Sequence, residues 1–250
     1  MSAQGSITFV PSVHFSPTHR RRVRRTIREE EPDIVAVELD ERRYDRIEKH
    51  GRQSPAELLR ELPPATAAAY TVLRTIQRTV VRLYGLDPSQ TDMEVAVETA
   101  AELNVDIALI DDPIAETVNA LASRVGPELI PKLFARAQRM GPEQQAAQFE
   151  LMTLPFEDVT SGEDVQPVIE QMRSLLPELT DVMIDRRDRA MAARLHALRA
   201  AGHDVVAVIG AGHHLGIQRT LDDLESRPAD ETVDVPIRSS SRSVTRIPID

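Results

Sequence analysis

Four short apolar runs, separated by helix-forming segments, constrain the fold of this chain more than any other feature. Three of them are continuous stretches rich in valine and isoleucine, which is typical of strands buried on both faces of a sheet. Strands that alternate with helices favour a mostly parallel sheet. We therefore predict an α/β fold with a mostly parallel or mixed central sheet flanked by helices. The four runs are residues 6–10, 34–37, 106–110 and 205–209.

Proline, glycine and capping residues predict where the helices begin and end. A helix is expected over residues 17–31, because Pro32 disfavours the α conformation of the residue before it. Residues 91–94 read Thr-Asp-Met-Glu, a capping box that opens a helix ending at Leu103. Gly202 is expected to cap the last helix before the fourth strand. Further helical segments are predicted over 40–50, 54–84, 114–201 with glycine and proline interruptions, and from the fourth strand to about Leu224.

We predict one domain over residues 1–250. The helical stretches at about 52–86 and 114–180 are insertions into the sheet or a cap on it, so the fold carries a large helical insertion in its middle. Because amphipathic helices serve either purpose, this part would be a lid or the surface of a homodimer. Two short alternating segments, 232–237 and 244–249, predict edge strands within residues 232–249.

The amino-acid composition excludes several classes of protein and of functional site. The chain has 250 residues, 41% hydrophobic and none of them cysteine, which excludes a disulfide scaffold, thiolate metal sites and cysteine nucleophiles. A net charge of −10 and 3% aromatic residues argue against a nucleic-acid partner. No apolar run reaches the roughly 18 residues of a membrane span. Residues 1–9 lack a signal-peptide pattern, so we expect a cytoplasmic protein.

Ionisable residues follow each of the four predicted strands. They are His14, Glu38, Asp111 and His213. Ligands of open α/β sheets bind at the carboxyl ends of the strands, where these side chains would converge. Two imidazoles and two carboxylates suit a divalent cation such as manganese, cobalt, zinc or iron, which would activate water for hydrolysis. The alternative is that polar side chains at strand ends simply meet solvent.

The helix predicted at residues 180–201 carries two charges beside its apolar stripe. Arg187 and Asp188 flank this stripe, and buried charges are costly unless they are paired or liganded. A functional interpretation gives Arg187 an oxyanion to bind and Asp188 a metal or a ligating histidine. The alternative is a structural ion pair, or an arginine whose stem packs on apolar neighbours. The stripe consists of Ile184, Met191, Leu195 and Leu198.

A glycine pattern follows the fourth strand. Gly210, Gly212 and Gly216 are spaced one residue too widely for a dinucleotide-binding loop, which disfavours nucleotide binding. The simpler interpretation is that Gly210 and Gly212 allow a tight turn that directs His213 into the site. Glu94 is explained by its place in the capping box.

Four segments resemble one known family, the TraB/PrgY (pheromone shutdown) family. They are residues 8–14 (TFVPSVH), 35–43 (VAVELDERR), 186–192 (RRDRAMA) and 206–216 (VAVIGAGHHLG). The segments occur in the family's order and cover nearly the whole domain. Glu94, Arg42, Gly210, Gly212 and Gly216 support these motifs.

The resemblance implies a fold and a chemistry. The wider group includes the Tiki proteins, metal-dependent proteases with two G-x-x-H motifs and a glutamate, which correspond here to His14, His213 and Glu38. Related erythromycin esterase-like and ChaN-like proteins share a mixed sheet flanked by helices. This chain departs from the pattern in lacking the first glycine, at Pro11, and in having Asp112 where the family commonly has arginine. Many relatives have C-terminal membrane spans, and we expect a protein without them because no run in this sequence is long and apolar enough.

The leading hypothesis is a divalent-metal-dependent, peptidase-like hydrolase that acts on or regulates a peptide signal. His14, Glu38 and His213 would bind the metal, and Asp111 or Asp188 would complete its coordination. Glu38 or a neighbouring carboxylate would act as general base, and Arg187 would stabilise the oxyanion. The sequence leaves open whether Glu38 is ligand or base. The alternative is a non-catalytic protein that sequesters a peptide or small-molecule ligand.

Overall fold

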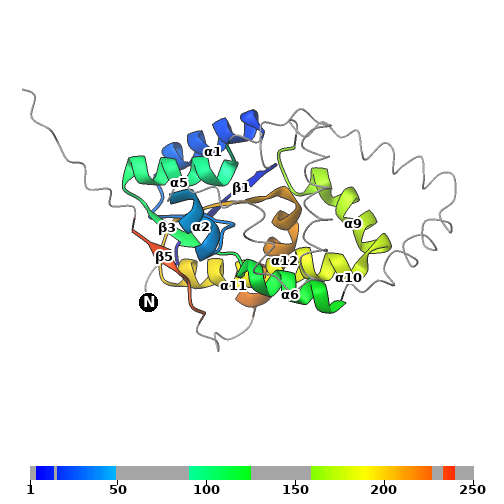
Figure 1. The fold of residues 1–250 in the computed structure, drawn as a ribbon. Helices are drawn as coiled ribbons and strands as arrows, with labels where there is room; N and C mark the ends of the chain where they lie inside the picture. The colour runs from blue at the N-terminus through cyan, green and yellow to red at the C-terminus, as the bar shows by residue number, and fades with distance from the viewer. Residues whose placement is uncertain (1–3, 14–15, 49–89, 125–158, 227–232, 240–250) are drawn as a thin grey trace, which may run out of the picture.

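The strands form one five-stranded sheet with the order β1-β4-β2-β3-β5 (Figure 1). The first four are parallel neighbours, and β5 pairs antiparallel with β3 at one edge. This confirms the predicted α/β fold with a mixed sheet. The strands are β1 (Ile7–Ser12), β2 (Ile34–Val37), β3 (Asp106–Leu109), β4 (Val205–Gly210) and β5 (Ile237–Arg238). The computed structural model describes residues 4–13, 16–48, 90–124, 159–226 and 233–239.

The register of the parallel strands brings their carboxyl ends to one edge of the sheet. Val37, the last residue of β2, is aligned with Leu109 of β3 and with Val208 of β4. Ser12, at the end of β1, is aligned with Gly210. The residues that follow β2, β3 and β4 are therefore neighbours in space although they are far apart in sequence.

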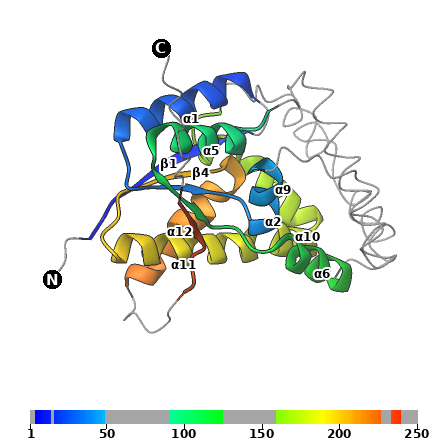
Figure 2. The same ribbon diagram turned by 60° about the vertical axis from the view of Figure 1, so that its left-hand side comes forward.

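Helices cover both faces of the sheet. In both views α1 (Pro17–Glu30) and α5 (Asp92–Leu103) lie above it, while α11 (Arg186–Ala200) and α12 (His214–Glu225) lie below it (Figures 1 and 2). Because side chains alternate along a strand, β2 supplies both cores. Val35 and Val37 join the core under α1 and α5, and Ile34 and Ala36 join the core over α11 and α12.

The helix ends follow the signals in the sequence. Ser16 caps α1, and the chain leaves this helix through Glu31, whose φ of 45° is left-handed, just before Pro32. The capping box at the start of α5 is confirmed, with Thr91 and Glu94 each binding the other's backbone N–H. After α11 the chain turns at Gly202, which has a φ of 93°.

The helical middle is interrupted more than the sequence indicates. In place of one helix from residue 180, a π-helical turn, η3 (Asp181–Asp185), precedes α11, and the N–H of Arg186 bonds to the carbonyl of Asp181. The other described elements here are α6 (Ile114–Arg124), η2 (Glu163–Val165), α9 (Gln166–Leu175) and α10 (Pro177–Thr180). The predicted helices within residues 54–84 and 125–158 lie outside the described residues.

The remaining described elements differ in extent from the helices and strands that the sequence predicts. The helix predicted over 40–50 is α2 (Glu41–Glu48), and a short 3-10 turn, η4 (Ala211–His213), connects β4 to α12. Of the predicted C-terminal edge strands, only the two residues of β5 pair in the described part, and residues 244–249 lie outside it.

The single domain stays a prediction. Among the described helices, none combines the length and apolarity needed to cross a membrane.

Candidate functional site

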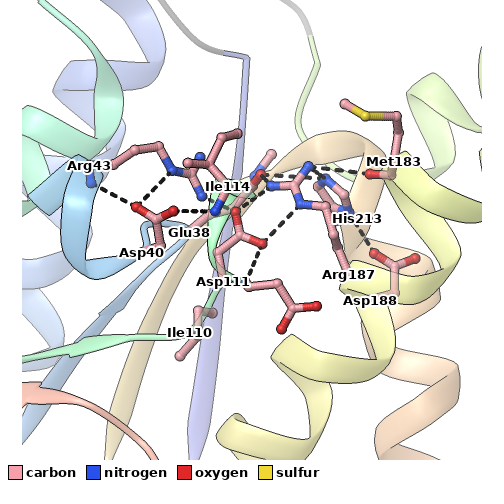
Figure 3. Close-up of polar contacts among 12 residues, drawn as sticks. Glu38, Asp40, Arg43, Ile110, Asp111, Ile114, Met183, Arg187, Asp188 and His213 are labelled. Atoms are coloured by element: carbon pink, nitrogen blue, oxygen red, sulfur yellow. Dashed lines mark hydrogen bonds and ion pairs between the residues drawn. The ribbon is translucent and has the colours of Figure 1, made fainter. Parts of the chain in front are cut away.

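Three residues that follow neighbouring strands meet at the carboxyl edge of the sheet. Glu38 comes directly after β2, Asp111 follows β3 by one residue, and His213 ends the 3-10 turn after β4. All three are buried, at 5% exposure each. They surround the guanidinium of Arg187, which projects from the first turn of α11 (Figure 3). His14, the fourth strand-end candidate, lies outside the described residues.

All five N–H groups of the Arg187 guanidinium have acceptors. Its Nε and Nη2 donate to the two oxygens of Asp111, at 2.9 and 2.7 Å, a bidentate pair of the strong charge-assisted kind. Nη2 also donates to Glu38 Oε1. Nη1 donates to the carbonyl of Met183 in the π-helical turn at 3.3 Å and to His213 Nε2 at 3.1 Å.

The two carboxylates have further donors that fix their positions. Glu38 Oε2 accepts the backbone N–H of Gly210 at 2.7 Å, which ties the end of β2 to the end of β4. Asp111 Oδ2 also accepts a hydrogen bond from Arg43 Nη2. Arg43 is held in turn by Asp40, whose Oδ1 accepts the backbone N–H of Arg43 at 2.7 Å.

Charge pairing outweighs burial at the two central groups. Burial alone would raise the pKa of Asp111, but the hydrogen bonds and charge of Arg187, with the charge of Arg43, hold it below its ordinary value. Burial also opposes the charge of Arg187, but the nearby Glu38 and Asp111 carboxylates raise its pKa above the ordinary value. The site therefore carries an ionised arginine paired with the ionised carboxylate of Asp111.

The hydrogen-bond network assigns the tautomer of His213. Because a guanidinium can only donate, Nε2 of His213 must accept the bond from Arg187. The proton of the neutral ring then lies on Nδ1, which is 2.6 Å from Asp188 Oδ1. Burial raises the pKa of Asp188, although the contact with His213 works in the opposite direction. Asp188 thus orients the ring of His213, whose Nε2 faces Arg187 at the centre of the site.

The predicted turn after the fourth strand is the 3-10 turn η4, which begins directly after Gly210, contains Gly212 and ends at His213. Gly210 has an extended φ of −60°, and Gly202 is the one described glycine with a positive φ. A Cβ on Gly216 would lie 1.7 Å from Asp188 Oδ2, so only glycine lets α12 pack against this carboxylate. At Gly212 a Cβ would meet the Cδ1 atom of Ile169 at 3.2 Å.

Two residues linked to the motifs lie apart from the network. Glu94 is engaged in its capping box, where Oε2 accepts the N–H of Thr91 at 2.7 Å. Arg42 is exposed, and the next residue, Arg43, reaches Asp111 instead. Sequence reasoning missed Arg43, and the signal that would have found it is Asp40, a helix-capping carboxylate three residues earlier.

Asp112, at the position where the family commonly has arginine, pairs with arginines of α11. Its Oδ1 is 3.3 Å from Arg194 Nη1, and its Oδ2 is 3.4 Å from Arg186 Nη2. The Asp112 carboxylate therefore forms two ion pairs with guanidinium groups of α11, beside the Arg187 network.

The described residues do not fit a divalent metal as they stand. Within the described ranges, no group of three or more acidic or histidine side chains has the arrangement of a metal site. Glu38, Asp111 and His213 instead share a guanidinium, whose positive charge would repel a metal placed among them. The predicted metal, with His14 as one ligand, stays a prediction.

The fold and this network define a class of protein: a mixed α/β sheet with a buried arginine, two carboxylates and a histidine–aspartate pair at its carboxyl edge. The family follows from the sequence. The chain belongs to the TraB/PrgY/gumN family, whose profile matches residues 2–230. This confirms the resemblance carried by the four segments described above.

Curated relatives come from archaea and mammals. The chain is 28% identical over 230 residues to an uncharacterized protein of Methanocaldococcus jannaschii, a match that covers 88% of this chain and 54% of that protein. It is 28% identical over 272 residues to the TraB domain-containing protein of Mus musculus and 27% identical to that of Homo sapiens. Both matches cover 96% of this chain and 68% of the mammalian protein. The chain thus spans about half of the archaeal relative and about two thirds of the mammalian ones.

Proposed function

We propose that this chain hydrolyses peptide or ester bonds, with His213 as the general base. The observation that carries the proposal is the arrangement of hydrogen-bond partners around this ring, with Asp188 at Nδ1 and Arg187 at Nε2. Asp188 accepts from Nδ1 and Nε2 is left as an acceptor, which is the arrangement by which a carboxylate orients a catalytic histidine. The pair lies at the carboxyl edge of the sheet, where ligands of α/β proteins bind.

The reaction follows from this arrangement. Nε2 of His213 takes a proton from water while the water oxygen forms a bond to the substrate carbonyl carbon. Asp188 stabilises the imidazolium that results. The C–N or C–O bond to the leaving group then breaks, and the leaving group takes the proton from Nε2, which restores the neutral ring.

Arg187 would supply the electrophilic group in the same step. In the resting site its Nη1 donates to Nε2 of His213. When water engages Nε2, this N–H loses its acceptor and becomes available for the oxyanion that develops on the carbonyl. Glu38 and Asp111 hold the guanidinium in place through its other edge.

The substrate class rests on the resemblance to the pheromone shutdown family. It supports a peptide signal as substrate and, with the sequence composition, a cytoplasmic protein without a nucleic-acid partner. A homodimer formed through the helical middle belongs to the same set of proposals.

A second candidate is a protein that binds a peptide or small molecule without cleaving it. The observation that favours it is the completeness of the network, because every N–H of Arg187 has an acceptor and His213 is buried without any ligand. In this case the network would fix the shape of the sheet edge and perform no chemistry.

One experiment separates the two candidates. Metal-stripped protein is screened against a peptide library and aryl esters. Both turnover and binding are measured for His213→Gln, for Asp188→Asn and for the control His196→Gln, which replaces a histidine of α11. The hydrolase proposal expects turnover to fall about 100-fold or more in His213→Gln while binding persists. Turnover that survives His213→Gln, or binding without turnover in the wild type, would overturn the hydrolase.

A further inference from the structure

We propose that a groove between α1 and α5 binds an acidic peptide segment in an extended conformation. This arginine groove is lined on one side by five residues of α1, namely Arg20, Arg21, Arg24, Arg25 and Arg28. Both helices lie on the face of the sheet opposite to α11, the helix that carries Arg187 (Figures 1 and 2). The inference therefore concerns a second surface and goes beyond the proposed function.

The arginine groove is a basic surface on an acidic protein. The chain has a net charge of −10, whereas α1 carries six arginines against two glutamates. The groove encloses about 570 Å³, and Gln90 and Val95, near the start of α5, line it from the second helix. Glu29, near the end of α1, is the acidic residue of its lining. Because the planar fork of arginine matches carboxylates, the groove suits an anionic ligand.

Two of the groove's arginines hold their present carboxylate partners loosely. Arg24 Nη2 is 3.7 Å from Glu98 Oε2, and Arg25 Nε is 3.7 Å from Glu29 Oε2. Both distances are too long for a hydrogen bond. Exposed ion pairs of this kind contribute little to stability, so the carboxylates of a ligand can replace Glu98 and Glu29 at low cost.

Two arginines also have donors left to satisfy. The buried Nε of Arg24 has no acceptor among the described residues. Arg21 donates from Nη2 to the hydroxyl of Thr18 at 3.3 Å, and within the described ranges no carboxylate pairs with it. Arg28 is better paired, with its Nη2 2.8 Å from Glu102 Oε2. A ligand carboxylate would therefore gain most from the part of the groove between Arg21 and Arg25.

The spacing of the arginines favours an extended peptide. Arg20, Arg24 and Arg28 follow one another at intervals of four residues, as do Arg21 and Arg25. Four residues of an α-helix rise about 6 Å. Every second side chain of an extended peptide lies on the same side, about 6.6 Å from the next. Acidic residues at alternate positions of a peptide would thus meet successive arginines.

A nucleic acid is the other polymer with regularly spaced negative charges. Its long-range attraction depends on the charge of the whole protein, which is −10 here. Single strands also need aromatic side chains on which bases stack, and aromatic residues make up 3% of this chain. A short acidic peptide needs neither, because it contacts only the groove.

Fluorescence anisotropy of the full chain tests the proposal. The probe is a fluorescein-labelled peptide of about ten residues in which aspartate and threonine alternate, and the control peptide has asparagine for aspartate. We expect saturable binding of the aspartate peptide at about 0.05 M salt and a clear loss of affinity at about 0.5 M salt, because salt screens exposed charges. The asparagine peptide should not bind. The assay needs no turnover, so its result is independent of whether the chain is a hydrolase.

Paired variants locate the binding surface. Arg21→Gln/Arg25→Gln removes two exposed arginines of the groove and should weaken binding about 10-fold, as expected for the loss of two exposed charge contacts. Arg42→Gln/Arg219→Gln removes the same charge from exposed positions of α2 and α12 and should leave the affinity unchanged. Circular dichroism checks that both variants are folded.

Four outcomes would overturn the proposal. A wild-type chain without saturable binding has no such site. Equal losses in the two double variants would reduce the effect to overall charge. An oligothymidylate that binds as tightly as the aspartate peptide, and is lost in the groove variant, would assign the groove to a phosphate polymer. Equal binding of a peptide of the same composition with adjacent aspartates would contradict the extended arrangement.

Discussion

Gly216 of α12 lies directly against the carboxylate of Asp188 on α11, so that a Cβ there would be 1.7 Å from Oδ2. We predict that Gly216→Ala forces the carboxylate away from His213 and lowers the free energy of unfolding by about 1–3 kcal/mol, as overpacking does. Denaturant unfolding measures the loss. Gly212→Ala is the control, because its Cβ meets only the end of a flexible isoleucine at 3.2 Å. Equal stability of the two variants would contradict this account of the helix contact.

Breaking the Arg187 network should destabilise the fold far more than breaking an exposed ion pair. Arg187→Ala leaves Glu38 and Asp111 buried without their shared cation, and we expect a loss of about 3–5 kcal/mol in the free energy of unfolding in metal-free buffer. The comparison is Arg173→Ala, which breaks an exposed pair with Asp185 and should lose about 0–1 kcal/mol. A loss at Arg187 no larger than the loss at Arg173 would show that the network does not hold the sheet edge together.

His214 should make the fold less stable in mild acid. Its Nδ1 accepts the N–H of Gly162 at 3.1 Å, and burial lowers the pKa of His214, which the nearby Glu163 only partly offsets. The unfolded chain therefore takes up this proton first, near pH 6.5, and stability falls as the pH drops from there through the lower folded pKa. Unfolding free energies measured between pH 8 and pH 5 should decline less steeply in His214→Gln than in the wild type. An unchanged slope would rule out this contribution, and His196→Gln controls for the loss of a histidine.

Glu94 should matter to stability and not to chemistry. Its carboxylate accepts the N–H of Thr91 while Thr91 Oγ1 accepts the N–H of Glu94 at 3.1 Å. We predict that Thr91→Ala lowers the free energy of unfolding by about 1 kcal/mol and that Glu94→Ala has a smaller effect of the same sign. Neither should alter hydrolysis or ligand binding once the protein is folded. A large loss of turnover in Glu94→Ala with an unchanged Tm would assign this residue to the site.

Much of the sheet could be predicted, because its signal is local. Runs such as residues 34–37 and 205–209 are buried on both faces and bounded by helix signals, and the capping box at Thr91 depends on residues three apart. The neighbourhood of Glu38, Asp111 and His213 followed from one general rule, that parallel strands end at a shared edge.

The centre of the site could not be predicted, because it depends on distances between segments far apart in the chain. Arg187 was placed beside an apolar stripe, but its position between Glu38 and Asp111 is set by how α11 packs below the sheet. The contact of Gly216 with Asp188 likewise depends on the spacing of two helices. Arg42 and Arg43 are adjacent residues of the same type, and the orientation of α2 decides that Arg43 is the one that reaches Asp111.

The most direct test of this account is the protonation of His213, which nitrogen-detected nuclear magnetic resonance of metal-stripped protein measures ring atom by ring atom. Assignment uses the loss of its signals in His213→Gln. We predict that the proton lies on Nδ1 toward Asp188 and that Nε2 is unprotonated toward Arg187. In Arg187→Ala the Nε2 signal should shift while Nδ1 keeps its proton. A wild-type ring with its proton on Nε2 would contradict both the network and the role of His213 as a base.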